Sequence, residues 1–196
     1  GYDFYNISFS PFYGANLLVK NLLDKFFSVF FIIMSLPIMI ISSVLILLED
    51  GFPIIYKQKR KGWDGKEFTM FKFRSMKKET NLEDEPKRVS KGPSMIAVTK
   101  DDKRLLKVGK ILRRFSIDEL PQFFNVLKGD MSIVGPRPHA NPITEYYSKD
   151  ILNFMQRHKC PPGLTGWAQV NGFRGTSNQE DIMDKRFHYD LYYIKN

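Results

Sequence analysis

The sequence is organised around residues 115–139, which read FSIDELPQFFNVLKGDMSIVGPRPH. Two adjacent carboxylates, Asp118 and Glu119, open this stretch, and an apolar run with helical spacing follows them. Pro121 fits only the first turn of a helix, where its missing N–H is not needed. The pattern therefore predicts a helix that begins near Asp118, where the helix dipole favours negative charge.

The two carboxylates each allow two interpretations. Asp118 is either the N-cap of the helix or a nucleophile of the kind that forms aspartyl-phosphate intermediates. Glu119 is either the partner of Ser116 in a capping box or a ligand of Mg²⁺. Adjacent helical residues point about 100° apart, so this pair cannot simply share one proton. One attacking carboxylate and one metal-binding carboxylate fit that divergence better.

A short strand and a rigid turn follow the predicted helix. Residues 132–134 have the apolar character of a strand, and Arg137 then stands between two prolines. A planar guanidinium on a rigid turn is suited to bidentate phosphate binding. The alternative for Arg137 is an ion pair that closes the loop. His139 shows no feature beyond its position next to this turn.

Composition and charge limit the classes of protein. A chain of 196 residues can form one core, or one core plus a membrane segment. Its 30 basic and 21 acidic residues give a net charge of +9, which suits anionic lipid, phosphorylated substrates or nucleic acid. No nucleic-acid-binding motif is present, so we expect no nucleic-acid partner. The single cysteine excludes an internal disulfide, and the three histidines lack zinc-ligand spacing.

Residues 26–48 form an uncharged and almost wholly apolar segment. As a helix this segment would be roughly 35 Å long, enough to cross a hydrocarbon core of about 30 Å. Pro37 lies near its middle, and Ser35 is one of three serines that can bond the backbone groups freed by the proline. Basic residues flank both ends, so charge gives no orientation. The residues alone favour a kinked span over a buried soluble helix, which would need a polar face.

Two further patterns predict structure on either side of the carboxylates. Residues 54–56 and 68–73 alternate like strands around a turn at 62–65, which predicts a β-hairpin. Near its end Lys72 and Arg74 would share one strand face, either as a half-buried strand or as a phosphate-binding one. The remaining segments are predicted as a mobile loop over 77–100, a basic helix over 99–114, an amphipathic helix over 143–158, a loop with a strand-like centre over 164–175, and a last helix over 181–194.

Several of these motifs resemble those of one family. Residues 113–139, the Lys-Phe-Arg-Ser-Met motif at 72–76 and the segment PGLTGWAQVNG at 162–172 resemble the bacterial sugar transferases, monotopic polyprenyl-phosphate hexose-1-phosphate transferases. The resemblance implies that a UDP-sugar and undecaprenyl phosphate give undecaprenyl-diphosphate-sugar and UMP. It implies a phosphoaspartyl-sugar intermediate on Asp118 and Mg²⁺ held by Glu119. Substrate phosphates would be bound by Lys72, Arg74, Arg113 and Arg137.

The resemblance also implies an α+β fold with a particular membrane arrangement. A helix–break–helix at Ser35 and Pro37 would enter one leaflet and return, followed by a small domain of amphipathic helices around a short β-hairpin. The expected organisation is a tail over 1–19, a re-entrant membrane helix over 20–50 and a cytoplasmic catalytic domain over 51–196. We expect this chain on the cytoplasmic face of the bacterial inner membrane, as a monomer or homodimer.

Two other functional classes stay open from the sequence. One is a basic, membrane-attached lipid-binding module without catalytic activity. The other is a hydrolase of nucleotide-sugars or lipid diphosphates that uses the same carboxylates with water. Within the transferase interpretation, residues 171–186 resemble members that act on glucose and galactose.

Overall fold

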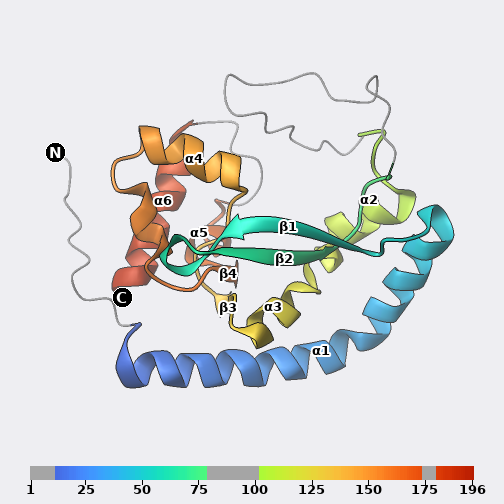
Figure 1. The fold of residues 1–196 in the computed structure, drawn as a ribbon, viewed down its shortest axis with the longest axis horizontal. Coiled ribbons are helices and arrows are strands. Elements are labelled where there is room, and N and C mark those ends of the chain that lie inside the picture. The colour runs from blue at the N-terminus through green and yellow to red at the C-terminus, as the bar shows by residue number, and fades with distance from the viewer. Residues whose placement is uncertain (1–11, 79–101, 174–179) are drawn as a thin grey trace.

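The computed structural model of the chain describes residues 12–78, 102–173 and 180–196. Its elements are α1 (Gly14–Asp50), β1 (Ile55–Lys61), η1 (Trp63–Gly65), β2 (Glu67–Phe73), α2 (Lys107–Arg114), η3 (Ile117–Glu119), α3 (Gln122–Lys128), β3 (Ser132–Val134), α4 (Asn141–Asp150), η4 (Phe154–His158), β4 (Gly163–Thr165), α5 (Trp167–Val170) and α6 (Glu180–Lys195). Figure 1 shows α1 running along one side of a domain that the shorter elements form. This mixture of helices and small sheets agrees with the predicted α+β class.

Helix α1 is continuous through Pro37. The expected break at Ser35 and Pro37 is therefore wrong as a break, although Figure 1 shows the helix curving in its C-terminal part. The Ser35 hydroxyl donates to the Phe31 carbonyl at 2.6 Å, whereas the carbonyl that loses its N–H partner at Pro37 is that of Ile33. The helix begins at Gly14 rather than at residue 20. Residues 1–11 of the predicted tail lie outside the described part of the chain.

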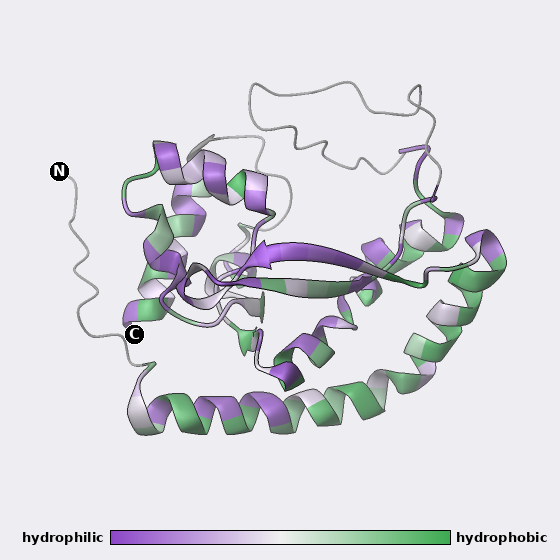
Figure 2. Cartoon of the chain, in the orientation of Figure 1, coloured by the Kyte–Doolittle hydropathy of each residue, from purple (hydrophilic) through white to green (hydrophobic). Residues whose placement is uncertain are grey.

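The face of α1 that packs on the domain is narrow and partly polar. Its buried residues fall into two groups with three- or four-residue spacing, which are Asp24 and Ser28 near the start and Met39, Ser42 and Ile46 near the end. Large apolar side chains cover most of the remaining surface and are exposed. Green stretches along α1 in Figure 2 mark its hydrophobic residues. By length and composition, α1 qualifies to cross a membrane. An exposed apolar surface of this extent is typical of a helix in contact with lipid.

The predicted hairpin and the short predicted strand are both present. Strands β1 and β2 pair antiparallel from Ile55↔Phe73 to Lys61↔Glu67, and η1 lies in the turn between them. Strand β3 pairs in parallel with β4 and forms a separate two-stranded sheet. Strand β2 and the turn after β3 each contribute a side chain that contacts Glu119 of η3.

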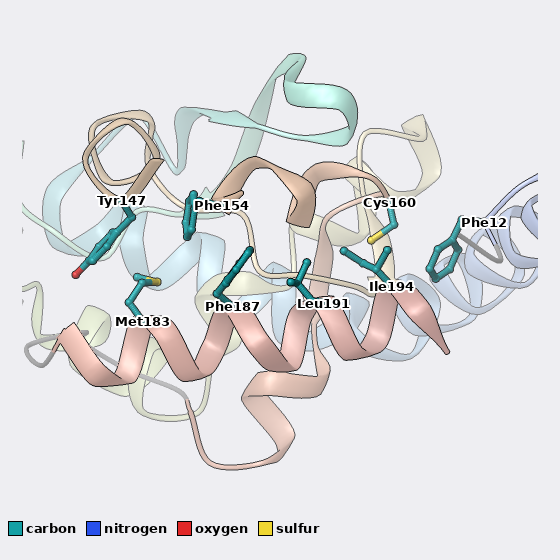
Figure 3. Close-up of a cluster of buried hydrophobic side chains, with 8 residues drawn as sticks. All are labelled: Phe12, Tyr147, Phe154, Cys160, Met183, Phe187, Leu191 and Ile194. Atoms are coloured by element: carbon teal, nitrogen blue, oxygen red, sulfur yellow. The ribbon is translucent and has the colours of Figure 1, made fainter. Parts of the chain in front are cut away.

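Three apolar clusters stabilise the domain. The largest lies along α6, as Figure 3 shows, and contains Phe12, Tyr147, Phe154, Cys160, Met183, Phe187, Leu191 and Ile194. A second joins α1 to α2 and β2 through Met39, Ile46, Phe73, Leu106, Val108 and Leu112. A small third cluster beneath the hairpin consists of Met70, Val126 and Met131. Since α1 contributes to the second cluster, it is an integral part of the fold.

The predicted helix over 143–158 is corrected by the structure. Helix α4 ends at Asp150, and Asn153 then takes a left-handed conformation with φ of 62° before η4 begins. Asn tolerates this conformation better than most residues. The predicted helices at 99–114 and 181–194 correspond to α2 and α6. Residues 79–101, most of the predicted loop, lie outside the described residues.

Candidate active site

Asp118 and Glu119 lie in the short 3₁₀ turn η3, ahead of α3. Ser116 precedes this turn in a left-handed conformation with φ of 59° and makes no side-chain capping bond. The predicted capping box is therefore wrong, because the backbone at Ser116 does not have the extended conformation of an N-cap. Pro121 stands at the start of α3, as expected, but the carboxylates sit one turn earlier.

Glu119 is held by two cations from different parts of the chain. Its carboxylate accepts a hydrogen bond from Lys72 of β2 at 3.0 Å and two from Arg137, at 2.5 and 3.2 Å. We call these three residues the ion-pair cluster. Burial alone would raise the pKa of Glu119, but the contacts with Arg137 and Lys72 lower it to about 2. Glu119 therefore stays ionised and joins β2, η3 and the turn after β3.

Asp118 has the opposite environment. Its side chain is buried, with 8% of the residue exposed, and among the described residues it accepts no hydrogen bond and forms no ion pair. Burial raises the pKa of Asp118, and the neighbouring charge of Glu119 adds to this effect, while nearby cations oppose it. A poorly solvated carboxylate without a partner has its lone pairs available to an incoming electrophile.

A buried asparagine fixes the distance between β2 and the carboxylates. Asn125 of α3 accepts a hydrogen bond from the backbone N–H of Phe71 at 2.9 Å and donates one to the Thr69 carbonyl at 2.7 Å. These bonds replace the pairing that an edge strand would otherwise lack. Because Lys72 follows Phe71 directly, Asn125 places the lysine against Glu119.

Close packing of backbone segments positions Arg137. A side chain at Gly135 would collide with the Pro161 carbonyl at 2.4 Å, and one at Gly163 with the Gly135 nitrogen at 2.1 Å. The glycines at 163 and 166 thus allow β4 to approach the turn after β3. Arg157 adds a hydrogen bond of 2.9 Å to the Arg137 carbonyl. These contacts hold the backbone from which the Arg137 side chain reaches Glu119.

The other predicted residues have different positions. Arg74 is buried and bonds the side chain of Asp50 and the carbonyls of Asp50 and Gly51, so it satisfies the C-terminal end of α1 rather than joining the ion-pair cluster. Arg113 lies exposed in the last turn of α2, close enough for its charge to act on Asp118. The structure therefore brings Lys72 and Arg137 directly to the carboxylates, with Arg113 nearby and Arg74 apart.

Arg60 is a cation near the site that the sequence analysis did not single out. In the structure Arg60 is half-buried on β1, and its charge interacts with Arg137 and Glu119. Its Nε has no hydrogen-bond partner among the described residues. Burial lowers the pKa of Arg60 to about 10. Strand alternation, which separates Arg60 from Lys59 and Lys61, is the signal that could have found it.

The residues around Glu119 fit Mg²⁺ only as an ion that arrives with a diphosphate. Within the described ranges, no group of three or more His, Cys, Asp or Glu side chains could hold a metal. One oxygen of Glu119 accepts hydrogen bonds from Lys72 and Arg137, and the other accepts one from Arg137. Among the described contacts, one of the four lone pairs of the carboxylate is therefore open. Mg²⁺ commonly takes one or two carboxylates together with substrate phosphates, and this donor set matches that mode.

Known proteins resemble this chain over most of its length. The sequence model of the family described as bacterial sugar transferase matches residues 15–196. A UDP-glucose:undecaprenyl-phosphate glucose-1-phosphate transferase from Klebsiella pneumoniae is 45% identical over 186 residues, covering 95% of this chain and 38% of that protein. A UDP-N-acetylgalactosamine-undecaprenyl-phosphate N-acetylgalactosaminephosphotransferase from Aeromonas hydrophila is 38% identical over 95% of this chain and 41% of its own length.

A third relative is matched over most of its length. An exopolysaccharide production protein from Rhizobium leguminosarum is 38% identical over 92% of this chain and 88% of that protein. The chain spans less than half of the longer transferases, between 35% and 38% in three of them. The family match nevertheless includes every element from α1 to α6. The chain belongs to the bacterial sugar transferase family.

Proposed function

We propose that this chain transfers a sugar 1-phosphate from a UDP-sugar to undecaprenyl phosphate, through a phosphoaspartyl-sugar intermediate on Asp118. The observation that supports this most is the contrast between the two adjacent carboxylates. Glu119 is bound by Lys72 and Arg137, whereas Asp118 is buried without a hydrogen-bond partner among the described residues. A free carboxylate beside a fixed, positively charged cluster is the arrangement that nucleophilic attack on a diphosphate requires.

In the first step a carboxylate oxygen of Asp118 attacks the β-phosphorus of the UDP-sugar. A new O–P bond forms, the bond from that phosphorus to the α-phosphate oxygen breaks, and UMP leaves with the bonding electrons. The charges of Lys72 and Arg137 act on Asp118, and that of Arg60 acts on Glu119 beside it. These cations would stabilise the charge that develops on the phosphate oxygens. Mg²⁺, when bound between Glu119 and the diphosphate, would supply further charge neutralisation.

In the second step an oxygen of undecaprenyl phosphate attacks the same phosphorus. The O–P bond to Asp118 breaks, the carboxylate is regenerated, and undecaprenyl-diphosphate-sugar is released. Arg113, exposed at the end of α2 and near Asp118, is available to bind the lipid phosphate. Arg74 has no part in this scheme, because Asp50 and the carbonyls at the end of α1 occupy its guanidinium.

The contacts of α1 support a monotopic arrangement at the membrane. Near its start, Asp24 accepts hydrogen bonds from the Ser132 hydroxyl at 2.7 Å and the Ile133 N–H at 3.1 Å. Near its end, Glu49 accepts hydrogen bonds from the first backbone N–H groups of α2, at 2.5 and 2.9 Å. Both ends thus bind one domain, which supports a placement of both ends on one side of the bilayer. We propose that α1 enters a single leaflet with its exposed apolar face and that the domain lies in the cytoplasm.

The experiment separates the two steps. The protein is incubated with Mg²⁺ and a panel of UDP-sugars, first without lipid, and UMP is measured. We expect a stoichiometric release of UMP and a sugar-phosphate adduct, which mass spectrometry locates on the peptide that contains Asp118. Addition of undecaprenyl phosphate then discharges the adduct and starts turnover. A panel is needed because the relatives use glucose in one case and N-acetylgalactosamine in another.

Asp118→Asn is the matched variant for this assay. Asn has the same shape, and Asp118 makes no hydrogen bond to another described residue that the amide would break, so the variant should fold and form no adduct. Sustained UMP release without lipid would indicate the hydrolase instead. Binding without any UMP release would indicate the non-catalytic lipid-binding module. UMP release that begins only with lipid would exclude the covalent intermediate and leave direct transfer.

A further inference from the structure

The hairpin presents a second cation to the site besides Lys72. In the antiparallel pairing of β1 with β2, Tyr56 lies opposite Lys72, and Arg60 lies opposite Phe68. Residues directly opposite each other, and residues an even number of positions apart on one strand, project from the same face of a sheet. Arg60 therefore shares the face of the hairpin from which Lys72 reaches Glu119.

A backbone contact holds Arg60 next to the turn that carries Arg137. On the other edge of β1, Arg60 forms an isolated antiparallel bridge with Ala140. Ala140 follows Arg137 by only three residues. The charge of Arg60 accordingly acts on Arg137 and on Glu119. Strand pairing on both sides thus fixes Arg60 beside the ion-pair cluster.

Arg60 differs from the two cations of the cluster because it has no acidic partner. Lys72 and Arg137 form ion pairs with Glu119, at 3.0 and 2.5 Å. Within the described residues Arg60 forms no ion pair, and its Nη2 donates to the Oε1 of Gln58 at 2.5 Å. A neutral amide orients the guanidinium but does not neutralise its charge.

The position of Arg60 makes the missing counter-charge unfavourable. The residue is half-buried, and a cation taken from water without a partner of opposite charge is destabilised. Burial and the charge of Arg137 lower the pKa of Arg60 to about 10, so it is still a cation at pH 7. Its Nη1 makes no hydrogen bond to a described residue and, unlike Nε, is not a buried atom. This donor is therefore open to a ligand.

We propose that Arg60 binds the phosphate that leaves with UMP. The inference rests on the proposed function, in which Asp118 attacks the β-phosphorus. The attacking and leaving oxygens are in line in such a displacement, so the α-phosphate lies away from Asp118. The main charges on Asp118 come from the ion-pair cluster and Arg113, whereas Arg60 acts on the cluster itself. Arg60 is thus placed for the phosphate beyond the reacting one.

A guanidinium suits this phosphate before and after the bond breaks. Its planar set of donors matches two phosphate oxygens at once. Negative charge on the α-phosphate increases as UMP leaves with the bonding electrons, and a fixed cation stabilises that increase. Because Arg60 stays protonated, it would stabilise the leaving group by charge and would not donate a proton.

The test compares UMP with uridine, which differ only in the phosphate. Isothermal titration calorimetry measures the affinity of the full chain for both, in detergent and with Mg²⁺. We expect the wild type to bind UMP at least tenfold more tightly than uridine. Arg60→Gln removes the charge and should weaken UMP binding about tenfold while uridine binding stays the same. Arg60→Lys keeps the charge and should recover part of this loss.

Lys59→Gln is the matched control. Lys59 is the neighbouring cation on β1, but its side chain is 75% exposed and pairs with Glu67 at 3.8 Å. This control should retain the wild-type affinity for UMP. A wild type that binds UMP no more tightly than uridine would overturn the proposal, and so would Arg60→Gln with wild-type affinity for UMP. An equal loss of both affinities would also overturn it, because that result indicates a purely structural role.

A kinetic measurement distinguishes the nucleotide phosphate from the lipid phosphate. In Arg60→Gln, kcat/KM for the UDP-sugar should fall at least tenfold, because this ratio reports the first step. A loss confined to kcat/KM for undecaprenyl phosphate would assign Arg60 to the lipid phosphate and overturn the proposal.

The two proposals fail in different ways. A wild type that forms the Asp118 adduct, together with an Arg60→Gln variant that binds UMP normally, would refute the phosphate site and keep the transferase. A wild type that distinguishes UMP from uridine through Arg60 but never releases UMP from a UDP-sugar would refute the transferase and keep the site.

Discussion

Replacing Glu119 by Gln tests whether the ion-pair cluster stabilises the fold. The pKa of Glu119 is about 2 in the folded chain against an ordinary 4.5. Each unit of pKa corresponds to ~1.36 kcal/mol, so ionised Glu119 contributes about 3 kcal/mol to the free energy of unfolding. Because the folded pKa is the lower one, this contribution is complete above pH 4.5 and is lost as the pH falls toward 2.

Thermal unfolding followed by tryptophan fluorescence in detergent measures this effect. A chain of this size changes its melting temperature by about 2–4 °C per kcal/mol, so Glu119→Gln should melt roughly 6–12 °C below the wild type at pH 7. The gap should narrow at pH values below 4.5. Glu67→Gln is the control, since its 3.8 Å ion pair with Lys59 is largely exposed and should contribute little. An equal melting temperature, or a gap that does not change with pH, would refute the reasoning.

Three further predictions concern catalysis and topology. Arg137→Lys keeps the charge but loses the bidentate contact with Glu119. We expect at least a tenfold loss of lipid-dependent UMP formation, which is about 1.4 kcal/mol of transition-state stabilisation. Full activity of this variant would leave Arg137 only its loop-closing role. Because the pKa of Asp118 is raised, kcat/KM should fall with acid at a pH above the ordinary 3.8 of an aspartate, and a limb at or below that value would argue against Asp118 as the nucleophile. Cysteines that replace the exposed Lys25 and Lys57 should both react with a thiol reagent from the cytoplasmic side. Native Cys160 should stay unlabelled, because burial raises its pKa to about 12. Labelling of the two positions from opposite sides would show that α1 spans the membrane.

Local patterns in the sequence were sufficient for the elements that carry the site. The alternation around residues 62–65 predicted the hairpin, and the apolar spacing after Pro121 predicted α3. These two results depend on short-range periodicity and on turn residues, which a single sequence displays directly. The grouping of Lys72 with Arg137 came instead from the resemblance to the bacterial sugar transferases, and the structure places both against Glu119.

Long-range contacts decided where prediction failed. Arg74 was grouped with Lys72 by strand alternation, but β2 ends at Phe73, and the chain beyond it turns toward Asp50 at the end of α1. The capping box at Ser116 required an extended backbone, whereas the junction between α2 and η3 imposes a left-handed one. No local pattern reports either constraint, because each depends on how two distant elements pack.

The amphipathic character of α1 was missed for a related reason. A soluble helix was dismissed because the apolar segment shows no polar face, yet Ser28 and Ser42 are buried toward the domain, on the same side as Asp24. Three small or charged residues among large apolar ones give a weak periodic signal. These three residues are recognised as a polar face only in the structure, where the large apolar residues of α1 face outward. The helix is organised for lipid outside and protein inside, the reverse of a soluble helix.

Two neighbouring carboxylates with opposite environments are difficult to explain as structural features alone. If both carboxylates stabilised the fold, each would have partners that offset the cost of its burial. An ionised carboxylate without partners is costly in a protein interior. Glu119 meets this expectation through Lys72 and Arg137. Asp118 has no such partner in the described part of the chain, and it has no position as a cap, since it lies inside η3. The fold therefore tolerates a destabilising group at one position, and such tolerance is typical of a residue retained for its chemistry.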